Sequence, residues 1–429
     1  MIPSPKAFRG PLKTSLAALL MLGTAGSALA QAPIQVESID ARTPEAYRPV
    51  PIRANAFEIT PYVETEVELV DNIFAVEADG VNDTVLSLIA GVGVGDRRQD
   101  RQIALRASVG HESYLDNTFE DRFRFDGTAN ARFGLGTLTQ TFIGGSVRHN
   151  GLQTSGLTAS SGIGRPIDLT NTRLNAGLRR EFGDITARFE GRYLGNRYGG
   201  NFFVSGEPFD AGIRDLDVYQ GRARLGYRVS PRDRVYVAAV YSDRRTKDLR
   251  DREDLLPGLR DNRSSEDIAL RVGYTREISE ILSLDANIGY LDRSFADPAR
   301  DNQGSLSFDA RVAWQPTQLT DIDLRAARLV DANNDPLSTG LLRTEVAGSI
   351  QHELLRNVII AGDARYSWLD LGGDDDLMLD DGKELIVGSS VRYLFSRHWS
   401  ARLRAEYLDR NGFFDGSQTR VSVGLRYNF

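Results

Sequence analysis

Arginine at alternate positions is the pattern in this chain with the most chemical potential. Arg222, Arg224 and Arg228 alternate with the apolar residues Leu225 and Tyr227. In an extended strand, residues two apart point to the same side, so these guanidinium groups would share one face. Fixed guanidinium groups attract anions, and rings of arginine select for anions in pores. The pattern therefore predicts an anion-attracting surface.

The argument that alternate residues of a strand share one face, called strand parity below, extends to other segments. Carboxylates on the predicted arginine face are fewer and include Glu64, Glu66 and Glu190. One interpretation is a net positive pore lining, and the other is a ladder of cross-strand ion pairs that mainly holds the wall. The excess of arginine over acid favours the first. The candidate pore-lining and selectivity residues are Arg124, Arg132, Arg188, Arg192, Arg222, Arg224, Arg228, Arg402, Arg404 and Arg426.

Enzyme chemistry finds little support in the sequence. The chain has no cysteine, and its four histidines, His111, His149, His352 and His398, have no metal-ligand spacing. Hydrolase, zinc-protease and phosphate-loop motifs are absent. A run of aspartates within 370–381 lacks a calcium-loop spacing, so we expect a solvated loop there. We therefore predict no enzyme, no catalytic residue, no metal and no cofactor.

The arginines lie in segments that alternate apolar and polar residues over ten to fifteen positions, the pattern of amphipathic strands. We expect eighteen strands, or sixteen if the region 83–149 is divided differently. The eighteen predicted segments are 59–73, 83–95, 101–115, 121–134, 137–149, 170–182, 185–198, 215–229, 233–244, 264–278, 281–294, 304–315, 320–329, 341–354, 358–371, 383–395, 399–409 and 418–429.

The connections between these segments alternate short and long. Gly134-Leu135-Gly136 and Gly183-Asp184 leave room only for tight turns, whereas 150–169 and 245–263 are long and polar. Short turns at one end and long loops at the other are typical of outer-membrane barrels, which have an even number of strands. We therefore predict an all-β fold, a transmembrane antiparallel up-and-down β-barrel. A soluble all-β array is the alternative, but aromatic residues near the strand ends favour the membrane.

The last segment supports this fold. Val421, Val423 and Leu425 share one face with Tyr427 and Phe429, and the sequence stops on that final aromatic residue. An apolar strand face that runs to a C-terminal phenylalanine is how outer-membrane barrels end. We predict that Tyr427 and Phe429 form the signal read by the outer-membrane barrel assembly machinery.

The N-terminal region divides into two parts before the barrel. Residues 1–30 combine a positive start, an apolar core and the small-residue site Ala28-Leu29-Ala30, which predicts a secretory signal peptide. Residues 31–56 contain four prolines, so we expect a periplasmic lead-in that cannot form a strand. The barrel would then span 57–429. The net charge of −7 gives no reason to expect nucleic acid as a partner.

Two short motifs carry a resemblance to a known family. Pro51-Ile52-Arg53, Phe57 and Pro61 precede Val70-Asp71-Asn72-Ile73-Phe74, and the closing part contains Tyr393-Leu394-Phe395-Ser396-Arg397-His398-Trp399-Ser400 and Ala405-Glu406-Tyr407. Residues 51–429 thereby resemble the outer-membrane β-barrel porin-2 family. Members of that family are often found with exopolysaccharide assembly systems. The resemblance implies an exit pore for a surface polysaccharide that works with a periplasmic polysaccharide-export protein.

We therefore expect a passive pore in the bacterial outer membrane that spans the lipid bilayer and exports a polysaccharide, acidic in view of the arginines. Two alternatives stay open at this stage. One is a general or anion-preferring porin for small solutes, in which 150–169 or 245–263 folds inward as a constriction. The other is a structural or adhesion barrel without conductance.

Overall fold

The computed structural model describes residues 43–75, 77, 80–96, 98–152, 167–199, 201–202, 208–209, 212, 215–246, 264–298, 302–331, 341–370, 382–412 and 415–429. The predicted signal peptide lies outside these residues, and so do the acidic run 371–381 and most of the long connections 150–169 and 245–263. Among the described residues, no helix is long and apolar enough to cross a bilayer.

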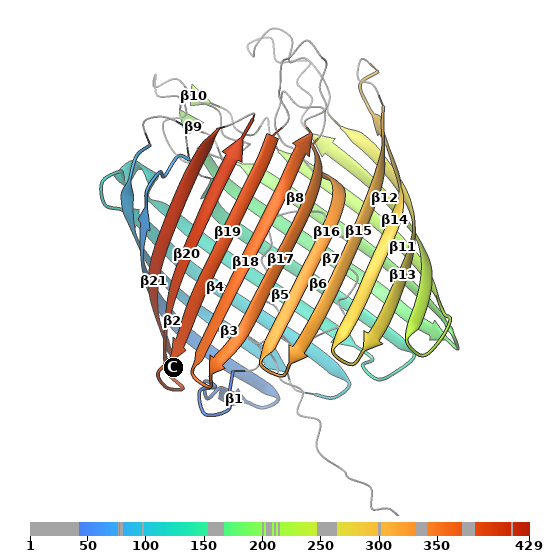
Figure 1. Ribbon diagram of the computed structural model, residues 1–429, viewed down its shortest axis with the longest axis horizontal. Helices are drawn as coiled ribbons and strands as arrows, with labels where there is room; N and C mark the ends of the chain where they lie inside the picture. Colours follow the sequence, from blue (N-terminus) through green and yellow to red (C-terminus); the bar gives the residue numbers. More distant parts are fainter. Residues whose placement is uncertain are drawn as a thin grey trace, which may run out of the picture.

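Eighteen long strands form one closed antiparallel barrel, each paired with the next in the sequence (Figure 1). They are β2 Phe57–Val70, β3 Asp83–Asp96, β4 Arg101–Tyr114, β5 Arg122–Phe133, β6 Thr139–Leu152, β7 Ile167–Phe182, β8 Ile185–Tyr198, β11 Leu216–Arg228, β12 Asp233–Thr246, β13 Ser265–Ser279, β14 Leu282–Phe295, β15 Gln303–Thr317, β16 Thr320–Asp331, β17 Leu341–Leu355, β18 Val358–Asp370, β19 Gly382–Leu394, β20 Trp399–Asn411 and β21 Gly416–Asn428.

The barrel closes where β2 pairs with β21, from Tyr62 opposite Asn428 to Val70 opposite Arg420. Each predicted segment coincides with one barrel strand to within a few residues at either end. The region 83–149 holds the four strands that were expected there, so the count of eighteen is confirmed and the alternative of sixteen is wrong.

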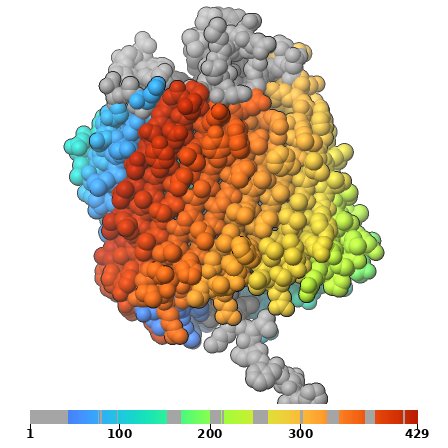
Figure 2. Space-filling view, viewed as in Figure 1, coloured from blue at the N-terminus to red at the C-terminus, as the bar shows by residue number. Residues whose placement is uncertain are grey.

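The outer surface of the barrel is apolar. On β2, Val67 and Leu69 are 47% and 57% exposed, while Glu66 and Glu68 point to the opposite, inner face. A soluble sandwich would bury the apolar faces of its strands against a second sheet. Here the orange and red strands form a continuous wall with nothing packed on it (Figure 2). The soluble all-β alternative is therefore wrong, and the exposed apolar surface suits contact with lipid.

The C-terminus and the tight turns lie at the same end of the barrel, which we call the short-turn end (Figure 1). Gly134 and Gly183 have φ angles of 71° and 62° in two of these turns, a conformation that favours glycine. Tyr427 packs against Trp399 and Phe429 with ring centroids 4.8 and 5.0 Å apart. Trp399 and Phe429 are exposed and Tyr427 is half-buried between them, so the three rings form part of an aromatic girdle, as predicted.

The Asp71-Asn72-Ile73-Phe74 motif fastens the barrel seam at the opposite end. The amide of Thr419 donates to Asp71 Oδ1 at 2.5 Å, and Asn72 Nδ2 donates to the carbonyl of Ser417 at 2.9 Å. Ile73 is 2% exposed, in a cluster with Val70, Val85 and Tyr114. The motif thus ties the end of β2 to the start of β21, which gives it a structural role.

The lead-in differs from the prediction in one respect. Residues 31–56 were expected to form no strand, but β1, Ile52–Ala54, pairs with the start of β2. This is possible because the last proline of the region, Pro51, precedes these three residues. Two further short strands, β9 Asn201–Phe202 and β10 Pro208–Phe209, pair with each other near the long-loop end (Figure 1).

The lead-in also contacts the inside of the barrel. Tyr47 packs against Ile359 and Leu394, which are 3% and 5% exposed and face inward near the short-turn end of β18 and β19. Arg397 Nε donates to the carbonyl of Ala46 at 3.3 Å. Residues 43–54 therefore lie across one side of the short-turn mouth, from β19 to β2.

Candidate functional site

The inner face of the barrel carries the predicted arginines. On β11, Arg222, Arg224 and Arg228 alternate with Leu225 and Tyr227, both 53% exposed on the outer surface. The same alternation places all ten candidate arginines on the inner face of their strands. Strand parity, which needs no knowledge of the neighbouring strands, thus predicted their direction correctly.

Several of these arginines pair with carboxylates on the same face. Arg188 and Arg192 share Glu190, with N···O distances of 3.1 and 2.6 Å. Arg124 pairs with Glu112 at 2.8 Å. The Arg124–Glu112 pair joins β5 to β4, as the cross-strand ladder considered from the sequence requires, whereas Glu190 holds two arginines of its own strand, β8.

β21 pairs with the acidic strand β2, and β20 is the next strand on the other side of β21. Arg404 pairs with Glu406 at 2.6 Å, and Arg426 lies 3.7 Å from Glu64. Glu66 is the next inward residue of β2. We call the inner face of β20, β21 and β2 the seam wall, and on it positive and negative side chains are interleaved.

The other candidates have a different environment. Arg132, Arg224, Arg228 and Arg402 make no ion pair within the described part of the chain. Arg222 shares their face and is only 9% exposed. An unpaired guanidinium on the inner face contributes a full charge to the field inside the barrel.

Pairing of β7, β8 and β11 places three arginines side by side. Arg179 is opposite Arg188, and Arg188 is opposite Arg224. We call these three residues the arginine row. In the same register, Ala238 follows on β12 and Arg271 on β13. Like charges directly opposite on neighbouring strands destabilise a sheet, so this arrangement needs support from elsewhere.

Aromatic rings supply part of that support. The Cζ of Arg224 lies 3.4 Å from the centroid of Tyr236, and the Cζ of Arg188 lies 4.8 Å from the centroid of Phe142. Tyr236 lies flat over Gly273, where a Cβ would collide with the ring. An arginine stacked on a ring keeps its planar edge available for hydrogen bonds to a ligand.

The same combination recurs on the seam wall. Arg426 stacks on Tyr62 with its Cζ 3.6 Å from the ring centroid, and Tyr62 lies over Gly91. Parity predicted the arginines but missed the rings, because each ring depends on a glycine opposite it in the next strand. A glycine directly opposite an aromatic residue on the neighbouring strand would predict such a ring. The sequence alone does not say which residues are opposite each other.

The histidines do not form a catalytic group. His111 and Glu112 are adjacent in β4 and so point to opposite faces of the wall. The Nδ1 of His149 lies 2.9 Å from the Thr170 hydroxyl. In the described ranges, no three His, Asp or Glu side chains are grouped as a metal site would require.

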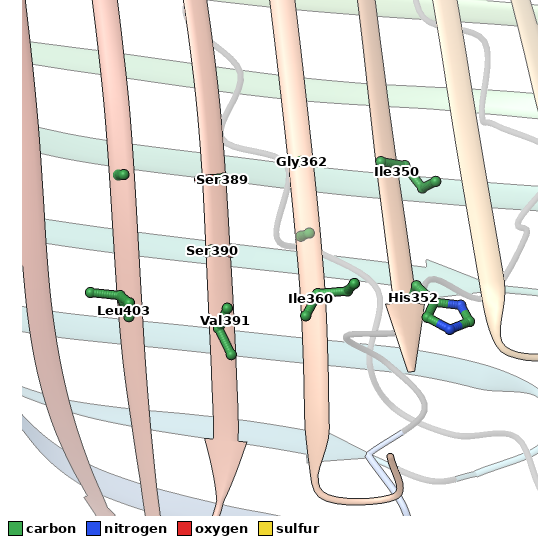
Figure 3. A pocket seen from close by; sticks show the side chains of 10 residues that line it. Ile350, His352, Ile360, Gly362, Ser389, Ser390, Val391 and Leu403 are labelled. Carbon is green, nitrogen blue, oxygen red and sulfur yellow. The ribbon is translucent and has the colours of Figure 1, made fainter. Parts of the chain in front are cut away.

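A shallow hollow lies on the outer surface over β17 to β20 (Figure 3). Ile350, Ile360, Val391 and Leu403 surround it, with Gly362 among them. These side chains alternate with the inward residues of their strands. The hollow therefore belongs to the outer surface and has no connection with the arginines inside.

No curated protein shows a significant similarity to this chain. Similar solved structures include OccK2 (OpdF) of Pseudomonas aeruginosa, 13% identical, covering 87% of this chain and 97% of that chain with a TM-score of 0.44. Another is the siderophore receptor PirA of Acinetobacter baumannii, 8% identical, covering 86% of this chain and 80% of that chain with a TM-score of 0.48. These likenesses concern the fold and not what the chain transports.

A family model described as "Putative beta-barrel porin 2" matches residues 44–429. This range begins in the lead-in and includes both motifs on which the family resemblance depended. Because the match covers the whole barrel, the chain belongs to the beta-barrel porin 2 family and is a porin-type channel of the bacterial outer membrane.

Proposed function

We propose that this channel is the outer-membrane exit pore for an acidic polysaccharide. The observation that supports the proposal most is the arginine row, three guanidinium groups in register on neighbouring strands inside the barrel. With Arg222 and Arg228 on the same face, the row gives one side of the lumen a positive potential. An eighteen-stranded barrel is wide enough for an aqueous channel, which a polymer can thread.

The proposed transport needs weak and repeated contacts. A pore conducts well when each contact is favourable enough to admit the substrate and weak enough to release it. Arg188 and Arg192 are each partly neutralised by Glu190, so they would attract a passing anion without holding it tightly. The barrel would act passively and without a cofactor.

The partners follow from the orientation of the barrel. In outer-membrane barrels the short turns face the periplasm, so the lead-in would meet a periplasmic polysaccharide-export protein there. Tyr427 and Phe429, which pack together near the same end, would be read by the barrel assembly machinery. Both roles are part of the proposal.

A deletion strain tests the export role directly. We expect loss of surface polysaccharide, full restoration by the wild-type chain, and partial restoration by a chain in which Arg222, Arg224 and Arg228 are glutamine. A deletion strain that still displays all of its surface polysaccharide would refute the proposal.

An anion-preferring porin for small solutes is the second candidate, favoured by Arg224 and Arg228, which make no ion pair within the described residues. The residues proposed to narrow such a pore, in 150–169 and 245–263, lie mostly outside the described part of the chain. Rapid swelling of liposomes in small anionic solutes, with export unaffected by deletion, would favour this candidate. A purified barrel without any conductance would instead support a structural or adhesion role.

A further inference from the structure

The arginine row has the properties of a built anion site rather than of a wall brace. Arg224 has no carboxylate partner among the described residues, although an acid is near. That acid, Asp285, accepts from the Tyr236 hydroxyl at 3.1 Å and from the Thr275 hydroxyl at 2.6 Å. Asp285 thereby holds the Tyr236 hydroxyl, and the Tyr236 ring lies beneath Arg224.

Arg188 is held in a similar way and keeps a free donor. Its side chain stacks on Phe142, and its Nη2 donates to Glu190 at 3.1 Å. Its buried Nε has no hydrogen-bond partner in the described structure. A buried donor without a partner is costly in a folded protein, and an anion bound beside it would supply the missing acceptor.

Two carboxylates limit the strength of the site. Glu181 pairs with Arg179 at 2.6 Å, and Glu190 pairs with Arg188. Of the three arginines, only Arg224 makes no ion pair within the described residues, so the row suits one monoanionic group at a time more than a dianion. Neighbouring strands are about 4.8 Å apart, so a group released by one arginine is within reach of the next.

We propose that Arg179, Arg188 and Arg224 form an anion subsite that binds the carboxylates of uronic acid units in a passing glycan. The guanidinium edge matches a planar carboxylate and can donate two parallel hydrogen bonds to it. Phe142 and Tyr236 fix the planes of two guanidinium groups before the substrate arrives, which lowers the cost of binding. This subsite rests on the proposed export function, since it names the chemistry of the exported polymer.

Block of the ion current through the purified barrel in a planar bilayer tests the subsite. The probes are oligogalacturonate, a neutral malto-oligosaccharide of the same length and a sulfated oligosaccharide. We expect concentration-dependent block by oligogalacturonate, and about tenfold weaker block after Arg224→Gln, since a charge-assisted hydrogen bond is lost. Arg179→Gln/Arg188→Gln/Arg224→Gln should remove the block.

The matched control is Arg420→Gln/Glu68→Gln, which deletes one ion pair of the seam wall, 3.4 Å long, and leaves the net charge unchanged. It should keep the wild-type block, and migration as a folded barrel on unheated gels shows that each variant is intact. Equal block by the neutral probe, Arg-dependent block by the sulfated probe alone, or full block in the triple variant would overturn the subsite. If block depends on Arg224 while the deletion strain still exports its polysaccharide, the export role fails and the subsite stands.

Discussion

The two sides of the lumen use arginine differently. On the seam wall, Arg404 and Arg426 lie 2.6 and 3.7 Å from carboxylates of the same wall. On the opposite side, Arg179, Arg188 and Arg224 are in register on neighbouring strands, and the last of them makes no ion pair within the described residues. Both sets arise from alternate positions in amphipathic strands. The comparison shows that strand parity places a charge inside the barrel, whereas the neighbouring strands decide whether that charge braces the wall or faces the substrate.

We expect the largest effect, a loss of barrel stability, from replacing Gly273, the glycine that lies beneath the Tyr236 ring. Gly273→Leu places a side chain where Tyr236 lies flat, so the ring and the stacked Arg224 must move. Overpacking of this kind costs about 3 kcal/mol of barrel stability. Gly221→Ala is the control, because a Cβ there meets no atom within 4 Å. Urea unfolding in detergent measures the free energy of unfolding of each variant. An equal loss of stability in the two variants would contradict the role assigned to Gly273.

Ion selectivity should show the next largest effect. Replacing Arg222, Arg224 and Arg228 with glutamine removes three positive charges from one side of the lumen. We expect the ratio of anion to cation permeability to fall about tenfold in a salt gradient across a planar bilayer. Arg420→Gln/Glu68→Gln, on the seam wall, should leave the ratio unchanged, because its net charge is conserved. If both variants behave alike, the distinction between the two sides of the lumen is wrong.

A pH effect is expected at the long-loop end of β4 and β5, outside the membrane span. Burial raises the pKa of Glu120, in the 3₁₀ turn η2 (Thr118–Glu120), to about 7. The protonated form is favoured in the folded turn, so its stabilising contribution is present at low pH and is lost as pH rises from about 4.5 through 7.

Hydrogen exchange at this turn gives the measurement. The amides of Glu120 and Asp121 donate to the carbonyls of Asn117 and Thr118. The free energy of opening at these two amides should fall by about 1 kcal/mol between pH 5.5 and 8.5, after correction for intrinsic exchange. Glu120→Gln should remove this dependence. A wild-type protection that does not change with pH would show that the carboxyl is not perturbed. The arginine row should be unaffected, since arginine stays charged over this range.

Much of the fold could be predicted because each strand carries its own information. The alternation around Leu225 fixed which face of β11 is apolar, and turns such as Gly183-Asp184 fixed where one strand ends and the next begins. The arginine row could not be predicted, because it requires the register of Arg188 against both Arg179 and Arg224. Register depends on cross-strand pairs and turn geometry together, and a shift of two residues would preserve parity while separating the three charges.

The contact of the lead-in with the short-turn mouth lies in a third region of the inner face. Removing this contact should give the smallest effect, a change in the labelling rate of one residue. Ile359 and Leu394 are apolar although they point into a polar lumen, and Tyr47 covers them. Since the chain has no native cysteine, a single Ile359→Cys reports access to this spot. Adding Tyr47→Ala should raise the rate of labelling by a membrane-impermeant maleimide about threefold, because the covering ring is gone.

Glu280→Cys, exposed in a turn at the same end, should label equally with and without Tyr47. If the reporter at position 359 is insensitive to Tyr47, then the lead-in does not stay docked, and the mouth is lined by the barrel strands alone.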